Sequence, residues 1–193
     1  MCNLYRMEKA PDAILGLARE LGMEVGFPEG VPNFEPRDVR ITERAPLLRA
    51  AAEGTVELVE RRWSWPGPTG KPVFNFRGEG RRFAPAERCV VLADGFYEFT
   101  TPEDPKAKRK DRWLFEWPQH PWFGIAGIVR ADPTVGEAFT LLTCEPGHDV
   151  KPYHNRQIVL LSPEDCFGWL DPEREAAEFV RPLPAGSLAV ARS

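Results

Sequence analysis

The most constraining feature of this 193-residue sequence is its content of proline and glycine, with 20 prolines and 16 glycines spread along it. Proline fixes φ and removes a backbone donor, and glycine weakens the interior of helices and strands. Together they divide the chain into short segments, which favours strands and turns over long helices. We therefore expect a β-rich α+β fold, and the length suits one domain that spans residues 1–193.

The runs between these breaks predict individual elements. Residues 11–22 have apolar positions at helical spacing, residues 24–38 hold three prolines and predict a loop, and residues 162–165 are typical of a helix start. A hairpin is expected around residues 53–54, although residues 47–54 would also suit a helical turn. Residues 101–111 predict a long basic hairpin loop, and residues 173–180 a short helix. Further strands are expected at residues 39–42, 73–77, 88–100, 112–117, 122–130, 137–146 and 156–162.

Charge and cysteine usage narrow the class of protein. The net charge is −4, yet residues 61–112 carry twelve Lys or Arg against seven Asp or Glu. This asymmetry fits one anion-facing side on an acidic protein, and equally a set of solvated strand faces. The N-terminal segment lacks the apolar stretch of a signal peptide, no run is long enough to span a membrane, and the cysteines lack metal-ligand spacing. These features favour a cytoplasmic protein without a metal or other cofactor.

The first two residues, Met1-Cys2, offer an unusual reagent. If Met1 is removed, Cys2 carries a free α-amine beside its thiol, and such a 1,2-aminothiol can condense with an aldehyde to a five-membered thiazolidine. At pH 7 roughly a tenth of an ordinary α-amine and a few per cent of a thiol are in the nucleophilic form, so an enzyme would need acid/base groups nearby. Taken alone, a cysteine at position 2 is more often an accident of a chain terminus.

Three further segments hold polar groups that a core strand does not need. Asn75, Arg77 and Glu79 alternate and would share one strand face, as a binding surface or as a solvated edge. Glu98 lies among aromatic residues, whose burial would raise its pKa towards the range useful for proton transfer. His154, close to Arg156, titrates near neutral pH with the least tuning.

The order and separation of these motifs resemble the SRAP family (SOS response-associated peptidase). The resemblance rests on Met-Cys at the start, Asn-x-Arg-x-Glu at residues 75–79, Ala-Asp-Gly-Phe-Tyr-Glu at residues 93–98 and His-x-Arg at residues 154–156. No single motif is specific, but the four together are strong. Residues 158–171 also look like the C-terminal part of the family, so nearly the whole chain is covered.

The resemblance implies a function and a fold. SRAP proteins lose Met1, bind single-stranded DNA and form a thiazolidine between the N-terminal cysteine and the ring-opened aldehyde of an abasic site, which protects the lesion. The implied fold is mainly antiparallel sheets that form a barrel-like core with a few short flanking helices. We expect a monomer whose partner is single-stranded DNA that contains abasic sites, and no membrane.

The resemblance also assigns roles to residues. Cys2 is the nucleophile, Asn75 orients the amine or the sugar, Glu98 acts as acid/base for amine activation, and His154 assists opening of the sugar ring. The implied DNA-binding residues are Arg77, Arg156, Trp63, Trp65, Arg81, Arg82 and Glu79, with Arg77 and Arg156 as phosphate ligands and the two tryptophans as stacking candidates.

Departures from the family pattern concern how DNA is held. Leu4 stands where the family has arginine, residues 63–66 replace Trp-Gly-Leu-Ile/Val-Pro, and Gln157 follows the His-x-Arg motif in place of Met. Two other functions remain open. Cys2 with His154 and Glu98 would also suit a thiol peptidase or N-terminal-nucleophile hydrolase, and the basic middle segment would suit a non-catalytic module that binds single-stranded or modified DNA.

Overall fold

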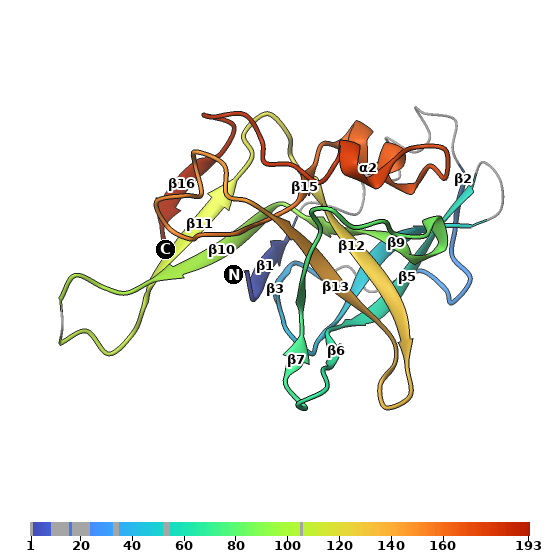
Figure 1. Cartoon of the computed structure of the whole chain (residues 1–193), viewed down its shortest axis with the longest axis horizontal. Helices are drawn as coiled ribbons and strands as arrows, with labels where there is room; N and C mark the ends of the chain where they lie inside the picture. Colours follow the sequence, from blue (N-terminus) through green and yellow to red (C-terminus); the bar gives the residue numbers. More distant parts are fainter. Residues whose placement is uncertain (1, 9–15, 17–23, 33–34, 52–54, 105) are drawn as a thin grey trace.

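The computed structural model describes residues 2–8, 16, 24–32, 35–51, 55–104 and 106–193. Within them, strands arranged in sheets dominate the fold (Figure 1). The helix expected at residues 11–22 lies outside the described residues, with the exception of Gly16. The turn expected at residues 53–54 also lies outside them. The expected β-rich fold with a barrel-like core is confirmed by the two sheets described next.

The first sheet contains the start of the chain. Its five strands are antiparallel, and β1 lies between β3 and β10, with Tyr5 opposite both Val39 and Phe96. Cys2 directly precedes β1, so this sheet fixes where Cys2 lies. In spatial order the strands are β16 (Ala189–Arg192), β11 (Asp111–Glu116), β10 (Gly95–Thr100), β1 (Leu4–Met7) and β3 (Arg37–Arg40).

The second sheet closes on itself. Strands β5, β4, β9, β12 and β13 pair in turn, and the parallel pairing of β13 with β5, with Phe139 opposite Trp63, completes a five-stranded barrel. The path of this sheet is β14 (Gln157–Ile158), β13 (Gly136–Cys144), β12 (Phe123–Asp132), β9 (Arg88–Ala93), β4 (Arg44–Ala50), β5 (Thr55–Trp63) and β2 (Glu24–Gly26).

Short strands complete the second sheet and form a separate ribbon. β8 (Asn75–Arg77) pairs with β13, and β15 (Leu160–Leu161) pairs with β12. β6 (Trp65–Pro66) and β7 (Pro72–Val73) pair with each other. The expected hairpin around residues 53–54 is present as the antiparallel pair of β4 and β5.

Several sequence predictions are wrong. The single strands expected at residues 73–77 and 156–162 are each divided, into β7 and β8 and into β14 and β15. Residues 88–100 form two strands, because the chain passes from the second sheet to the first at Asp94, whose backbone N–H donates to the carbonyl of Arg6. Gly95 suits this crossing, since a side chain there would collide with Leu114. Residues 24–38 are not all loop, because β2 pairs in parallel with β5 and β3 begins at Arg37.

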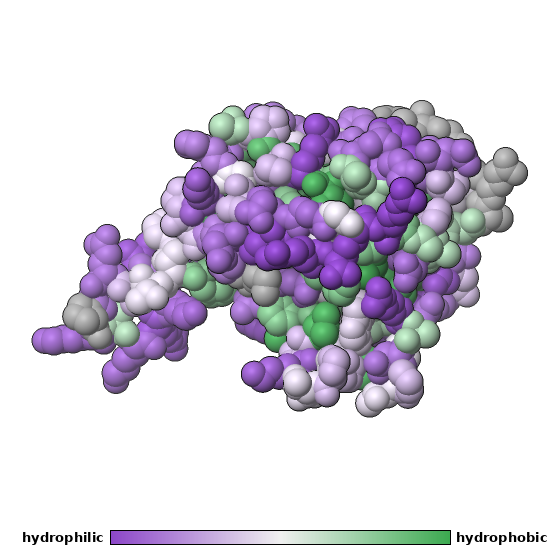
Figure 2. Space-filling model, in the orientation of Figure 1, coloured by the Kyte–Doolittle hydropathy of each residue, from purple (hydrophilic) through white to green (hydrophobic). Residues whose placement is uncertain are grey.

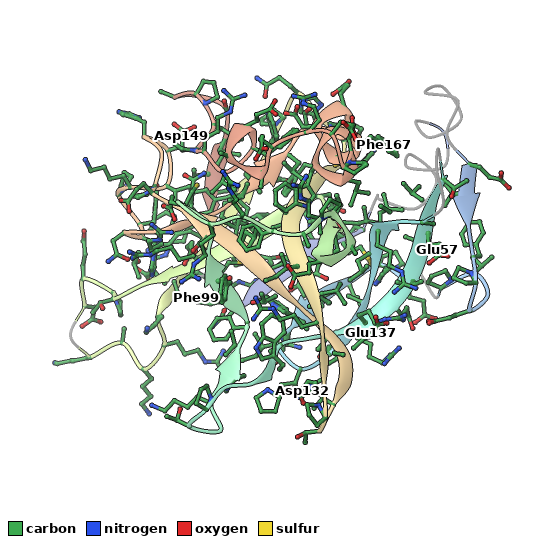
Figure 3. The ribbon with its side chains drawn as sticks, turned by 45° about the vertical axis from the view of Figure 1, so that its right-hand side comes forward. Glu57, Phe99, Asp132, Glu137, Asp149 and Phe167 are labelled. Carbon is green, nitrogen blue, oxygen red and sulfur yellow. The ribbon has the colours of Figure 1, made fainter. Side chains whose placement is uncertain are left out.

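The closure of the barrel is reinforced on its surface by ion pairs. Arg61 on β5 donates 2.7 Å from Nε to Oε2 of Glu137 on β13, and Arg49 on β4 lies between Glu57 and Glu137, both labelled in Figure 3. The parallel pairing of β13 with β5 involves few residues. The ion pairs between neighbouring strands therefore help to fix the register of this pairing. Such partly exposed pairs contribute modestly to stability.

One continuous apolar cluster joins the two sheets. It contains Tyr5, Phe96 and Phe115 from the first sheet and Leu47 and Phe139 from the second. Helix α2 (Pro163–Leu170) covers the barrel, and its Ser162 N-cap accepts a hydrogen bond from the N–H of Asp165 at 3.1 Å, as the sequence predicted. The helix packs so closely that a side chain at Gly124 would collide with Cys166.

Two 3₁₀ turns are also present among the described residues. They are η1 (Pro85–Glu87) and η2 (Ala176–Glu178), and the second lies inside the segment 173–180 where a short helix was expected. The resemblance implied a few short flanking helices. Helix α2 and these two turns correspond to them in the part of the chain that is described. Helix α2 lies against β9, β12 and β15, at the top of the view in Figure 1.

Candidate functional site

Cys2 lies in the apolar core at the entrance to β1. Its side chain is only 1% exposed, and Sγ donates a 3.3 Å hydrogen bond to the carbonyl of Leu4. Burial raises the pKa of the thiol far above its ordinary value, and the negative charge of Glu98 adds to this rise. The thiol is therefore neutral at physiological pH.

Asn75 holds the main chain of Cys2. Strand β8 lies beside β13, with Asn75 opposite Leu141, and from there Nδ2 donates a 2.8 Å hydrogen bond to the carbonyl oxygen of Cys2. The other end of this amide, Oδ1, is buried and has no hydrogen-bond partner among the described residues. A buried acceptor without a partner is costly, so this oxygen is suited to receive an N–H or O–H from a reactant.

Glu98 comes from β10, the strand next to β1. Its side chain is 1% exposed, and burial raises the pKa of the carboxyl above its usual range. Strand β11 places Trp113 directly opposite Glu98. A carboxyl group with a raised pKa can both accept and return a proton near neutral pH, which agrees with the sequence expectation for this residue.

His154 lies in the loop between β13 and β14. Its ring is fixed by a 3.0 Å hydrogen bond from the backbone N–H of Arg156 to Nδ1. The carbonyl oxygen of Arg156 lies 3.1 Å from the same Nδ1, so the tautomer of the ring decides whether Nδ1 accepts from the N–H or donates to the carbonyl. Burial lowers the pKa of His154, and the positive charges of the chain's α-amino group and of Lys110 lower it further. These effects favour the neutral imidazole, which can accept a proton at one ring nitrogen.

The expectation that Arg156 binds phosphate is corrected by the structure. Its side chain is only 7% exposed, and Nη1 and Nη2 donate at 2.6 Å to the two carboxylate oxygens of Glu79. Nη1 also reaches Glu145, and Nη2 reaches the carbonyl of Thr143. A guanidinium with both ends paired in this way fixes the loop of His154 to the end of β8, and Glu79 serves as its partner instead of facing DNA.

The other expected DNA-binding arginines are exposed. Arg77 ends β8, and Arg81 and Arg82 follow in the next loop. The Arg81 guanidinium lies 4.7 Å from the centre of the Phe76 ring. The exposure of these side chains next to Asn75 is what phosphate binding requires, so their role stays a prediction.

The choice of Trp63 as a stacking platform is wrong, and Trp65 is poorly placed for that role. Trp63 is fully buried, lies parallel to Phe139 with 6.3 Å between ring centres, and donates from Nε1 to the carbonyl of Phe74. Trp65 is 9% exposed and lies beneath the guanidinium of Arg130. These indoles are core residues because the closure of the barrel passes through Trp63.

Sequence reasoning missed two features of this region. Trp113 is half-buried and packs against Tyr153, the neighbour of His154, with 4.9 Å between ring centres. The register of the β10 and β11 hairpin would have found it, since it pairs Trp113 with Glu98. The second feature is Arg6, which donates at 2.6 Å to both Asp94 and Glu116 and so ties β1 to the crossing between the sheets.

Within the described residues, no group of three or more His, Cys, Asp or Glu side chains is arranged to hold a metal ion. The same part of the chain has no helix that is long and apolar enough to cross a membrane. The residues described above offer an aminothiol precursor, a carboxyl group, an imidazole and an amide.

Comparison with known proteins identifies the class. The model of the SRAP family, SOS response associated peptidase, matches residues 1–192. The chain therefore belongs to the SRAP family, as its motifs indicated. Three solved structures share the fold at low identity: a phage-related protein from Bordetella bronchiseptica (TM-score 0.73, 20% identity, 100% of this chain and 94% of that chain), a second B. bronchiseptica protein (0.71, 20%, 100% and 99%) and a Bacteroides thetaiotaomicron protein (0.71, 19%, 99% and 91%).

Two relatives of this chain are named abasic site processing proteins. The abasic site processing protein YoaM of Bacillus subtilis is 28% identical over 202 residues, which cover 95% of this chain and 85% of YoaM. The abasic site processing protein HMCES of Gallus gallus is 32% identical over 124 residues, which cover 50% of this chain and 36% of HMCES. The match to HMCES thus spans little more than a third of that protein.

Proposed function

We propose that this protein processes abasic sites in single-stranded DNA, by forming a covalent thiazolidine between Cys2 and the aldehyde of the opened sugar once Met1 has been removed. The observation that carries the proposal is the convergence of Asn75 and Glu98 on Cys2. Three strands far apart in sequence place an amide and a proton-accepting carboxyl group at the one residue able to become an aminothiol. The names of the relatives YoaM and HMCES support the choice of substrate.

The first step is opening of the sugar. An abasic deoxyribose is mostly a closed hemiacetal, and opening it moves a proton from the anomeric hydroxyl to the ring oxygen. The neutral His154 ring accepts the proton of the anomeric hydroxyl, and the imidazolium so formed returns that proton to the ring oxygen as the bond from C1 to the ring oxygen breaks. The product is an aldehyde with a free hydroxyl at C4.

The second step joins protein and DNA. The α-amine of Cys2 adds to the aldehyde carbon, and loss of water gives an imine. Glu98 accepts a proton from the attacking amine and returns it to the departing hydroxyl, and burial raises its pKa in the direction that favours both transfers. The free Oδ1 of Asn75 is placed to accept a hydrogen bond from the amine and so orient its lone pair.

The third step closes the ring. The thiol of Cys2 adds to the imine carbon, a C–S bond forms, and the S–H proton passes to the nitrogen with Glu98 as carrier. Aldehyde and aminothiol thus become thiazolidine and one water. Because burial and Glu98 keep the thiol protonated, sulfur acts after the amine in this scheme.

The same pKa argument weighs against the hydrolase alternative. A thiol peptidase needs its cysteine as thiolate in the resting state, and the surroundings of Cys2 disfavour that form. The non-catalytic alternative does not explain why Glu98 is buried or why Asn75 donates a hydrogen bond to Cys2.

The test is intact mass spectrometry before and after incubation with single-stranded DNA that carries one abasic site. We expect a mass without Met1, then an adduct equal to protein plus DNA minus one water. Cys2→Ala should give no stable adduct. Cys2→Ser should give an imine that borohydride traps but that heating reverses, since the thiol is missing. Equal stable adducts from wild type and Cys2→Ala would overturn the proposal.

A further inference from the structure

A basic projection stands out from the rest of this acidic protein. The hairpin of β10 and β11 extends away from the sheets, and hydrophilic side chains cover it (Figures 1 and 2). We name residues 101–104 and 106–112 the basic arm. Its outgoing side carries Glu103 and Asp104, and Asp104 shapes the turn by accepting from the N–H of Lys106. All the arm's cations follow this turn: Lys106, Lys108, Arg109, Lys110 and Arg112.

A hollow of about 480 Å³ lies at the base of this returning side. Residues 107–112 of the arm and the last two residues of the sequence line it. Five of these lining residues are Lys or Arg, whereas Asp111 is the single acid among their side chains. The protein as a whole has a net charge of −4, so this concentration of positive charge is a local feature.

The charges in the hollow differ in whether they are already paired. Arg192 pairs with Asp111, and Arg112 donates to Ser193 and lies 4.9 Å from the centre of the Tyr97 ring. By contrast, Lys108, Arg109 and Lys110 form no ion pair with the described residues, and all three are exposed. Exposed cations without an ion-pair partner around a polar hollow are suited to bind a phosphate, because its negative charge would neutralise theirs.

The arm leads to the site of Cys2. It connects β10, which carries Glu98, to β11, which carries Trp113 opposite Glu98. At its base, Lys110 is close enough to His154 for its charge to act on that ring. A chain of phosphates bound along the arm would therefore lead towards the imidazole of His154.

We propose that the basic arm binds the phosphate backbone of the DNA strand on one side of the abasic site and so directs the lesion to Cys2. The inference rests on the function proposed above and adds a polarity to it. Because the arm projects from one edge of the site, it meets either the 5′ or the 3′ flank of the strand, and only that flank gains affinity from it.

The experiment uses Cys2→Ala protein, which lacks the thiol, with DNA that has no reactive aldehyde, so that binding is measured without a covalent step. Two series of fluorescent single-stranded oligonucleotides carry a stable abasic analogue, one with a growing 5′ flank and one with a growing 3′ flank. We expect affinity to rise with length more steeply in one series. The variant Lys108→Gln/Arg109→Gln/Lys110→Gln should abolish that excess and reduce the slope of log affinity against log salt by about 2, since each phosphate contact on a single strand contributes about 0.7.

Two controls separate position from total charge. Arg40→Gln/Arg174→Gln/Arg181→Gln removes three exposed cations on other elements and should leave the excess in place. Lys108→Arg/Lys110→Arg retains the charge and should bind as the parent does. An unchanged slope and excess in the arm variant, or an equal loss in the Arg40 control, would overturn the inference.

The outcome is independent of the covalent chemistry. If wild type forms no adduct but the arm variant loses the flank-specific affinity, the proposed reaction fails and the arm inference stands. If wild type forms the adduct and the arm variant binds every oligonucleotide as the parent does, the arm inference alone fails.

Discussion

Asn75 donates a 2.8 Å hydrogen bond from its side-chain amide to the main-chain carbonyl of Cys2, across 73 residues of sequence. The bond fixes the residue that would carry the new α-amine to strand β8, and through β8 to the barrel. The thiol of Cys2 is fixed by a separate hydrogen bond, which it donates to the carbonyl oxygen of Leu4. Cys2 is therefore held at two points before any DNA is present, which reduces the entropy that a reaction there would have to overcome.

Replacement of Asn75 by Ala should slow adduct formation by about 100-fold, because a small displacement of a reacting group has an effect of this size. The loss of one hydrogen bond should lower the free energy of unfolding by about 1 kcal/mol. Denaturing gels over time and urea unfolding measure the two effects. Asn3→Ala, at an exposed neighbour, is the control, and equal rates in the two variants would contradict the role of Asn75.

Replacement of Glu98 by Gln should lower the adduct rate by about 10²- to 10⁴-fold, as for loss of a general acid/base. It should also change how stability depends on pH. Burial raises the pKa of Glu98 in the folded protein, so above about pH 4.3 the folded state holds a proton that the unfolded state has lost. Wild-type stability therefore falls relative to the variant as pH rises to the folded pKa.

Urea unfolding across pH 4 to 8 measures this difference for Glu98→Gln. The exposed arm residue Glu103, changed to Gln, serves as the control. A difference between wild type and Glu98→Gln that stays flat with pH would show that Glu98 is not held in its protonated form by burial.

Replacement of His154 by Gln should remove a pH dependence of the opposite sign. Burial lowers the pKa of His154, so below about pH 6.5 the unfolded chain binds a proton that the folded chain does not yet bind. Wild-type stability then falls as pH drops from about 6.5 towards the folded pKa, and the variant should lack this component. His148→Gln, on an exposed ring, is the control for the unfolding curves.

The kinetic role of His154 is tested with two substrates. If it opens the sugar, His154→Gln should slow the reaction with abasic DNA by about 100-fold and leave the reaction of Cys2 with a small open-chain aldehyde nearly unchanged. Equal slowing with both substrates would place His154 in a later step.

Arg77 and Arg156 should respond in opposite ways to replacement by Gln. Loss of Arg156 leaves Glu79 and Thr143 without their partner and should lower the free energy of unfolding by about 1.5 to 3 kcal/mol, as for hydrogen bonds to a charged group. Loss of the exposed Arg77 should leave the melting temperature unchanged and weaken binding to single-stranded DNA. Calorimetry and fluorescence anisotropy test the pair, and an unchanged melting temperature for Arg156→Gln would contradict the structural role.

The residues proposed for catalysis could be chosen from sequence because they belong to short local motifs. Cys2, Asn75, Glu98 and His154 each stand in a pattern that the family shares, and the structure brings Asn75 and Glu98 to Cys2. The DNA-binding assignments were less reliable. Whether Trp63 stacks on a base or packs in the core depends on burial, and Trp63 is buried because β5 meets β13 there.

The sequence by itself determined the class of fold, the start of helix α2 at Ser162 and the choice of the groups proposed to react, because breaks, caps and short motifs act within a few residues. The tertiary structure alone decided the division of residues 88–100 between two sheets, the pairing of Arg156 with Glu79 and the position of Trp113 opposite Glu98. Each of these depends on which strands become neighbours. Closure of a sheet selects those neighbours through burial and register over the whole chain, which no local pattern encodes.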